Sequence, residues 1–148
     1  MLVRLMYASR ATAPIRAETL AAILRKATPN NAACGVTGVL CHTGAVYLQA
    51  LEGGRNAVSS LYHRIARDPQ HTDVTLLSYE ETSERIFAGW SMGQVDVSRL
   101  NPALVLKYSD EATLDPYAMR GVVALALLKE LVETASVTCL ASTLVARS

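Results

Sequence analysis

The pattern of apolar and polar positions along the first hundred residues predicts alternating strands and helices. Apolar residues alternate with polar ones where a half-buried strand is expected, and they recur every three to four residues where an amphipathic helix is expected. The expected strands are residues 2–8, 35–42, 45–52, 73–80 and 91–97. The expected helices are residues 16–28, ended by Pro29-Asn30-Asn31, and residues 56–67, ended by Asp68-Pro69.

The order strand, helix, two strands, helix, two strands is the split β-α-β pattern of ferredoxin-like folds. It predicts an α+β sandwich with both helices on one face of a single sheet. Because crossover connections are right-handed, we expect the first and third strands to lie side by side and parallel at the centre of the sheet.

Composition changes near residue 100, so we divide the chain into a domain of residues 1–98 and a helical extension of residues 99–148. Asp115-Pro116 resembles a helix N-cap followed by proline in the first turn. We expect a helix over residues 116–134, with a shorter one near 103–108, to cover the sheet face opposite the core helices, because an apolar face is not left in water. Residues 135–148 are expected to be poorly ordered or weakly helical.

Helical spacing assigns the apolar residues of this extension to two sets. The set expected to face the sheet is Met119, Val122, Val123, Ala126 and Leu127. A second set is expected to offer a surface to another subunit or to a partner protein, and it consists of Leu125, Leu128 and Val132.

Composition and charge narrow the class of protein. Hydrophobic residues make up 51% of the chain and charged residues 18%, which is enough apolar material for a core. The formal net charge of +1 leaves no electrostatic footprint for nucleic acid. No apolar run reaches the roughly 18 residues of a membrane span, and the first residues lack the features of a signal peptide. We therefore expect a soluble, cytoplasmic protein.

Its three cysteines match neither a disulfide framework nor a metal site. They are Cys34, Cys41 and Cys139.

Two polar residues in the predicted central strands are the first candidates for a site. Tyr7 and Gln49 would meet in the cleft between the two helices if the strands are neighbours, either as a hydrogen-bonded pair that fills the core or as part of a ligand site. Asn30 and Asn31 could face the same cleft, or simply terminate a helix. Arg64 or Arg67 could meet a phosphate there.

Trp90 and Met92 are expected on one strand face, either as core residues or near the site. No nucleotide-binding or hydrolase motif is present in the sequence, so we expect no enzymatic activity.

Taken together, these residues resemble the BLUF family, the sensors of blue light using FAD. The resemblance covers residues 2–93. Its elements are Leu5-Met6-Tyr7-Ala8-Ser9, Asn30-Asn31, Gly35-Val36-Thr37-Gly38-Val39-Leu40, Tyr47-Leu48-Gln49-Ala50-Leu51-Glu52-Gly53, Tyr62-His63-Arg64-Ile65 with Asp68 and His71, and Trp90-Ser91-Met92.

The resemblance implies that FAD lies non-covalently between the two helices. By matched position, Tyr7 would donate an electron and a proton to the excited flavin, and Gln49 would bridge Tyr7 and the flavin as a hydrogen-bond switch. Trp90 and Met92 would relay the signal, and which of the two faces the flavin stays open. The other implied flavin-binding residues are Asn30, Asn31, Ile23, Arg64, Ile65, Asp68 and His71.

The signal would then pass to a separate downstream protein through the extension, and self-association of the chain is also expected. Two other functions stay open at this stage. A ligand-binding regulatory module on the same fold would lack a flavin spectrum. A small flavin-dependent oxidoreductase would turn over a nicotinamide cofactor.

Overall fold

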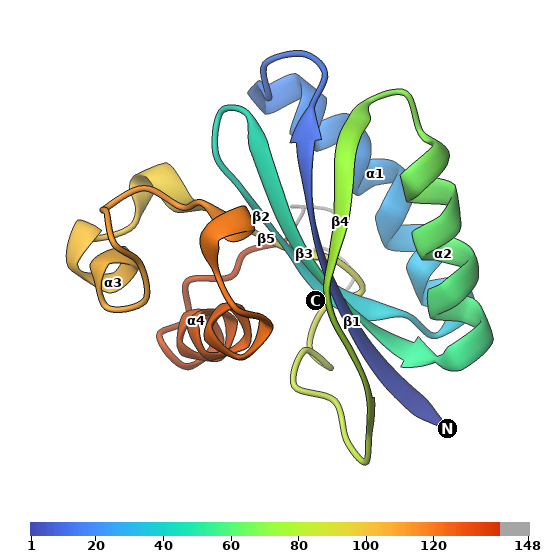
Figure 1. The fold of residues 1–148 in the computed structure, drawn as a ribbon. Coiled ribbons are helices and arrows are strands. Elements are labelled where there is room, and N and C mark those ends of the chain that lie inside the picture. Colours follow the sequence, from blue (N-terminus) through green and yellow to red (C-terminus); the bar gives the residue numbers. More distant parts are fainter. Residues whose placement is uncertain (140–148) are drawn as a thin grey trace, which may run out of the picture.

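The computed structural model describes residues 1–139 and consists of one sheet with helices on both faces (Figure 1). The strands are β1 (Leu2–Ala11), β2 (Thr37–His42), β3 (Val46–Gly54), β4 (His71–Thr82) and β5 (Gly93–Asp96). The α-helices are α1 (Ala17–Cys34), α2 (Arg55–Arg67), α3 (Pro102–Leu106) and α4 (Gly121–Glu133), and short 3-10 turns span Val97–Arg99 and Pro116–Ala118. The expected α+β class is confirmed, with α1 and α2 on one face and the extension on the other.

The sheet has the order β4-β1-β3-β2-β5. The first and third strands are neighbours as expected, but they are antiparallel, so the expectation of a parallel pair is wrong. The reason lies in the connections. The crossover through α1 makes β1 and β2 parallel, and the hairpin after β2 then returns β3 in the opposite direction between them.

The first helix extends further than the sequence suggested. Pro29 lies inside α1 and does not end it, because a proline removes only one backbone donor while the rest of the helix stays bonded and packed. The helix ends at Gly35, whose φ of 70° is accessible to glycine at little cost. Gly35 N–H donates to the carbonyl oxygen of Ala32 at 3.3 Å, and Val36 N–H donates to that of Asn31 at 2.9 Å.

The two faces of the sheet carry separate cores, because alternate residues of β1 and β3 point to opposite sides. We call the first the cavity-side core; it lies under α1 and α2 and includes Val3, Leu5, Tyr7, Leu20, Leu24, Leu40, Leu51, Val58 and Met92. We call the second the extension-side core; it includes Met6, Val39, Cys41, Leu48, Ala50, Phe87, Ala124, Leu127, Leu128 and Leu131.

Helix α4 covers the expected face of the sheet, but the side of the helix that packs against the sheet differs from the expected one. Its buried residues are Ala124, Leu127, Leu128 and Leu131, whereas Val122 is 65% exposed. Leu128 is buried and Leu125 and Val132 pack against the extension-side core, so these three do not form the partner surface that we expected.

The start of α4 also differs from the expected one. Asp115 caps only the 3-10 turn at Pro116–Ala118, and the α-helix begins at Gly121. A Cβ atom on Gly121 would lie 2.7 Å from the carbonyl oxygen of Leu77 on β4, so the backbone of the first turn lies directly against the sheet.

After a turn at residues 134–135, the described chain up to residue 139 is not helical and runs beside β5. Thr138 pairs with Gln94 of β5 through two backbone hydrogen bonds of 2.8 and 3.0 Å, and Val137 is buried. We expected residues 135–148 to be poorly ordered or weakly helical. Residues 135–139 are not helical and pair with β5 at Thr138, and residues 140–148 lie outside the described residues.

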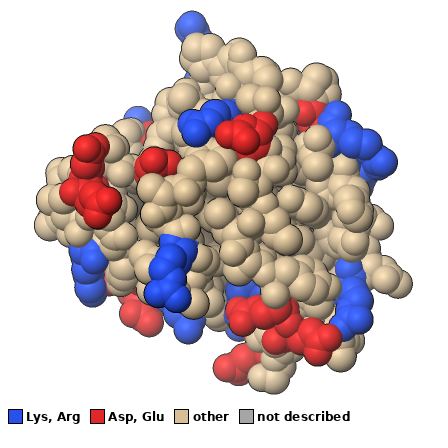
Figure 2. All heavy atoms as spheres, viewed as in Figure 1, with Lys and Arg blue, Asp and Glu red and all other residues tan. Residues whose placement is uncertain are grey.

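The surface charge is mixed. On the face shown in Figure 2, Lys and Arg side chains lie among Asp and Glu side chains, and no basic stripe forms. Within residues 1–139, no helix has both the length and the apolar composition needed to cross a bilayer.

The packing of α4 leads to a test of stability. Leu127→Ala should lower the free energy of unfolding by about 2–5 kcal/mol, because it removes a buried side chain and leaves a cavity. Val122→Ala, on the exposed side of the same helix, should change it by less than about 0.5 kcal/mol. Urea unfolding of both variants measures the difference. Equal, small effects would show that α4 is not part of the cooperative fold.

Candidate functional site

A cavity of about 670 Å³ lies between α1, α2 and the sheet, and we call it the α1–α2 cavity. Its volume is within the range of small-molecule and cofactor sites. Sheet residues at its base are Tyr7, Leu40, Tyr47, Gln49 and, just before β5, Met92. Helix α1 contributes Glu18, Thr19, Ala22, Ile23, Lys26, Ala27, Asn30 and Asn31, and the second wall consists of Leu61, Arg64, Ile65, Asp68, Gln70 and His71.

The antiparallel register of β1 and β3 places Tyr7 directly opposite Gln49. Both side chains point into the α1–α2 cavity and both are buried. The phenol O–H of Tyr7 donates to Oε1 of Gln49, and Nε2 of Gln49 donates to the sulfur of Met92 at 3.2 Å. These three residues form a continuous hydrogen-bonded chain along the floor of the cavity.

Burial controls the acidity of Tyr7. Removal from water raises the pKa of its phenol far above the usual range, and the neighbouring Tyr47 and Tyr62 act in the same direction. The ring of Tyr62 lies 5.6 Å from that of Tyr7, centroid to centroid, at a tilted angle. The phenol is therefore protonated at neutral pH.

The two asparagines lie on the last turns of α1, which the left-handed cap at Gly35 holds beside the sheet. Asn31 is buried and its Nδ2 donates to the carbonyl oxygen of Ser91 at 3.0 Å. Asn30 is exposed on its outer side and also lines the cavity. Both residues line the cavity, and they lie inside the helix and not after it.

Most of the remaining predicted residues also line the cavity, but Arg67, the alternative to Arg64, is not among its lining residues. Ile23 of α1 and Ile65 of α2 are apolar wall residues, and the exposed Arg64 lies along the second wall. His71 Nδ1 lies 2.8 Å from the hydroxyl of Ser9. Burial lowers the pKa of His71, and the nearby Asp68 opposes this shift.

The structure separates Trp90 from Met92. Met92 lines the α1–α2 cavity, whereas Trp90 packs against the extension-side core. The expectation that they share a face is wrong, because β5 begins only at Gly93 and the bend at residues 91–92 breaks the alternation of a strand.

Sequence reasoning missed Lys26, Gln70 and Tyr47 as lining residues. A signal was present for Lys26. It follows Ile23 by three residues and precedes Asn30 by four, so it lies on the same helical stripe. A cation within an apolar stripe that faces a cavity is available to an anionic ligand.

The side chains fit a flavin. Amides on the cavity floor and on α1 offer donors and acceptors to a polar heterocycle, and the isoleucines on opposite helices offer apolar surfaces to its two sides. Lys26 and Arg64 supply positive charge for phosphate groups. Neither Cys34 nor Cys41 is among the described lining residues, and within residues 1–139 no cluster of metal-ligating side chains is found.

Comparisons with known proteins agree with this fit. The profile of the BLUF family, described as sensors of blue-light using FAD, matches residues 2–93. The chain is 42% identical over 92 residues to the photoactivated adenylate cyclase subunit beta of Euglena gracilis. That match covers 62% of this chain but only 11% of the cyclase subunit, so the similarity concerns a small part of the relative.

Two solved structures resemble a larger share of the chain. The dark-state structure of BlrB, a BLUF protein, has a TM-score of 0.76 at 28% identity and covers 90% of this chain and 96% of that one. The photo-activated state of BlsA has a TM-score of 0.76 at 29% identity and covers 88% and 94%. These shares extend the structural similarity beyond residue 93.

The buried phenol predicts a pH dependence of stability. The pKa of Tyr7 is higher in the folded protein than in the unfolded chain, where it is about 10. Its contribution is therefore fully present below pH 10 and is lost as pH rises, at up to about 1.4 kcal/mol per pH unit.

Urea unfolding at pH 9, 10 and 11 should show a steeper loss of stability for the wild type than for Tyr7→Phe. Parallel pH profiles of the two proteins would contradict the buried position of this phenol.

Proposed function

Because this chain belongs to the BLUF family, the sensors of blue light using FAD, we propose that it binds FAD non-covalently in the α1–α2 cavity and signals through a hydrogen-bond switch at Gln49. The family is defined by light sensing and not by catalysis, so the matched domain is a photosensor and not an enzyme. The observation that carries the proposed mechanism is the buried chain from Tyr7 through Gln49 to Met92 on the cavity floor.

Binding would use side chains from both helices. Asn31 and Asn30 would offer amides to the polar edge of the ring, and Ile23 and Ile65 would pack on its two sides. Cationic residues along α1 and α2, with Asp68 and His71 at the far end of the wall, would hold the ribityl and phosphate groups. No covalent link is expected, which is why the dark state can return thermally.

The bound flavin would supply the absorption of blue light and, once excited, an acceptor for one electron. Tyr7 is suited to donate that electron together with its proton. Its raised pKa keeps the phenol neutral before light, so no phenolate competes. When the phenol loses an electron it becomes strongly acidic, and Oε1 of Gln49 is already placed to accept the proton.

Gln49 is suited to act as a switch because its two ends have unequal partners. The phenol of Tyr7 is a strong donor to Oε1, whereas the thioether of Met92 is a weak acceptor for Nε2. Rotation or tautomerisation of the amide exchanges a donor for an acceptor on each side. A new donor toward the ring would shift its absorption to longer wavelength.

The output would leave through the opposite face of the sheet. Trp90 packs against the extension-side core that α4 covers, two residues from Met92 in the cavity. We propose that rearrangement at Gln49 reaches this core through residues 90–92 and that a separate partner protein, bound at the extension, receives the signal. Self-association of the chain is part of the same proposal.

The purified protein should be yellow, or take up FAD on reconstitution, and blue light should shift its absorption slightly to the red without bleaching it. The shift should reverse in darkness, because no bond is formed. Absorption spectra before and after illumination provide the test. A protein that does not bind flavin, or a bleached spectrum with no red-shifted state, would overturn the proposed function.

Tyr7→Phe and Gln49→Leu should each keep bound flavin and lose the red-shifted state. The first removes the donor of the electron and proton, and the second removes the switch, while both keep most of the buried volume. Tyr62→Phe is the matched control, because its ring lies beside Tyr7 but its hydroxyl is outside the hydrogen-bonded chain. A normal shift in either test variant would show that its assigned role is wrong.

A further inference from the structure

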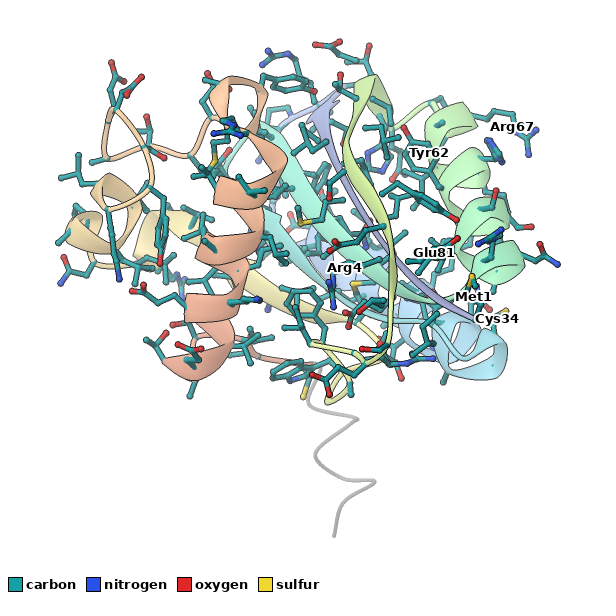
Figure 3. The ribbon with its side chains drawn as sticks, turned by 60° about the horizontal axis from the view of Figure 1, so that its bottom comes forward. Met1, Arg4, Cys34, Tyr62, Arg67 and Glu81 are labelled. Atoms are coloured by element: carbon teal, nitrogen blue, oxygen red, sulfur yellow. The ribbon has the colours of Figure 1, made fainter. Side chains whose placement is uncertain are left out.

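A buried ion pair lies on the side of the sheet opposite the α1–α2 cavity. Arg4 and Glu52 face each other across β1 and β3, and Nε of Arg4 lies 2.8 Å from Oε2 of Glu52. The Glu52 side chain is 0% exposed and that of Arg4 is 7% exposed. Figure 3 shows Arg4 beside the strands, on the side that faces α4.

The carboxylate of Glu52 also binds the chain segment that joins β4 to β5. Its Oε1 accepts the backbone N–H groups of Ile86 at 3.0 Å and Phe87 at 2.6 Å, and Oε2 accepts that of Ile86 at 2.9 Å. Arg4 adds a second contact to this segment, from Nη2 to the carbonyl oxygen of Glu84 at 3.3 Å. One side chain of β3 therefore fixes the start of residues 84–92.

The other end of the segment is held at the cavity. Gly38 N–H donates to the carbonyl oxygen of Trp90 at 3.1 Å, and Asn31 donates to that of Ser91 at 3.0 Å. Met92 then presents its sulfur to Gln49. Gln49 and Glu52 are three residues apart on β3 and point to opposite faces, so they contact opposite ends of the same short segment.

A buried ion pair contributes little net stability, because well-packed apolar residues at the same site stabilise the fold equally or better. A carboxylate adds directional hydrogen bonds, which apolar side chains cannot form. It accepts several N–H groups in a fixed geometry, and charge-assisted bonds are shorter and stronger than neutral ones. The Arg4–Glu52 pair is therefore suited to hold a backbone segment in position.

We propose that Glu52, held by Arg4, is a positioning residue for the switch: it fixes residues 86–87 so that Met92 stays against the amide nitrogen of Gln49. The inference rests on the proposed photochemical function. It adds a residue on the far face of the sheet, outside the cavity, that sets how long the switched state lasts.

The test uses the full chain with Arg4→Met and Glu52→Gln together. This pair of substitutions keeps the side-chain volume and one acceptor oxygen and leaves no unpaired buried charge. Flavin content should stay within twofold of the wild type, because neither residue lines the cavity. The rate of dark recovery after blue light should change by about tenfold or more.

The decisive comparison is a double-mutant cycle with Met92→Ala. If Glu52 acts through Met92, the recovery rate of the Met92→Ala protein should be unchanged, within twofold, when the Arg4 and Glu52 substitutions are added. An equal change of rate in both backgrounds would overturn the inference, and so would a recovery rate that the Arg4 and Glu52 substitutions leave unaltered in the wild-type background.

The matched control is the exposed ion pair of Arg55 and Glu81, whose side chains are 51% and 60% exposed. Figure 3 shows Glu81 beside Met1, away from Arg4. Arg55→Met with Glu81→Gln makes the same chemical change and should leave the recovery rate within twofold of the wild type.

Failure of this inference is distinct from failure of the proposed function. A wild-type protein with no red-shifted state would overturn the function itself. A normal wild-type photocycle that the buried pair does not affect would overturn only the role of Glu52.

Amide hydrogen exchange on the wild-type chain supplies a second measurement that needs no buried substitution. Ile86 and Phe87 should exchange more slowly than the exposed Ala88 and Gly89 by at least tenfold. Similar rates at all four amides would overturn the inference.

Discussion

The antiparallel pairing of β1 with β3 is the constraint on which the rest of the structure depends. Both strands are buried on both faces along most of their length, so neither can slip by a residue without turning one core into the other. The register that this double burial enforces sets Tyr7 opposite Gln49 on one face and Arg4 opposite Glu52 beside them on the other. The Tyr7–Gln49 pair, to which we assign the photochemistry, and the ion pair are thus positioned by the same backbone ladder.

Sequence patterns predicted the elements well because each pattern has a local cause. Alternation in residues 2–8 and 45–52 reflects the pleat of a strand, and the stripe of α1 reflects its one buried side. The expected end of α1 before Pro29 is wrong because a proline does not by itself end a helix, whereas the left-handed conformation of Gly35 does. The direction of β3 was wrong because it depends on a hairpin and a crossover acting together, and no single pattern encodes that.

The site was predicted more fully than the signal path. Tyr7 and Gln49 stand out because they are polar residues in strands that otherwise have the apolar pattern of a core, whereas Asn30 and Asn31 were candidates at the expected end of a helix. Glu52 carries the same signal, since it interrupts an apolar strand and its partner position on β1 holds Arg4. Its contacts with the backbone of residues 86–87 could not be predicted, because every non-proline residue has a backbone N–H group and the residue type does not show which of them Glu52 binds. Trp90 and Met92 could not be separated from sequence, because they lie two residues apart in a stretch that resembles the start of a strand. Gly89 and Gly93 flank the bend at residues 91–92, but a glycine before a strand does not show which neighbouring side chain turns to which face.

Energetics explain why a small switch needs a stiff connection. In the proposed switch, exchange of one hydrogen-bond partner at Gln49 would change the free energy by about 1–3 kcal/mol, which is also the usual size of coupling between two sites. A partner protein can respond only if most of this free-energy change reaches the surface that it contacts. A mobile connecting segment would absorb this free-energy change through its own conformational entropy.

The segment between Phe87 and Met92 is instead bonded at both ends, by Glu52 in the extension-side core and by Asn31 and Gly38 at the cavity. A displacement of Met92 therefore has few ways to relax except by moving Trp90 and Phe87, which lie in the core beneath α4.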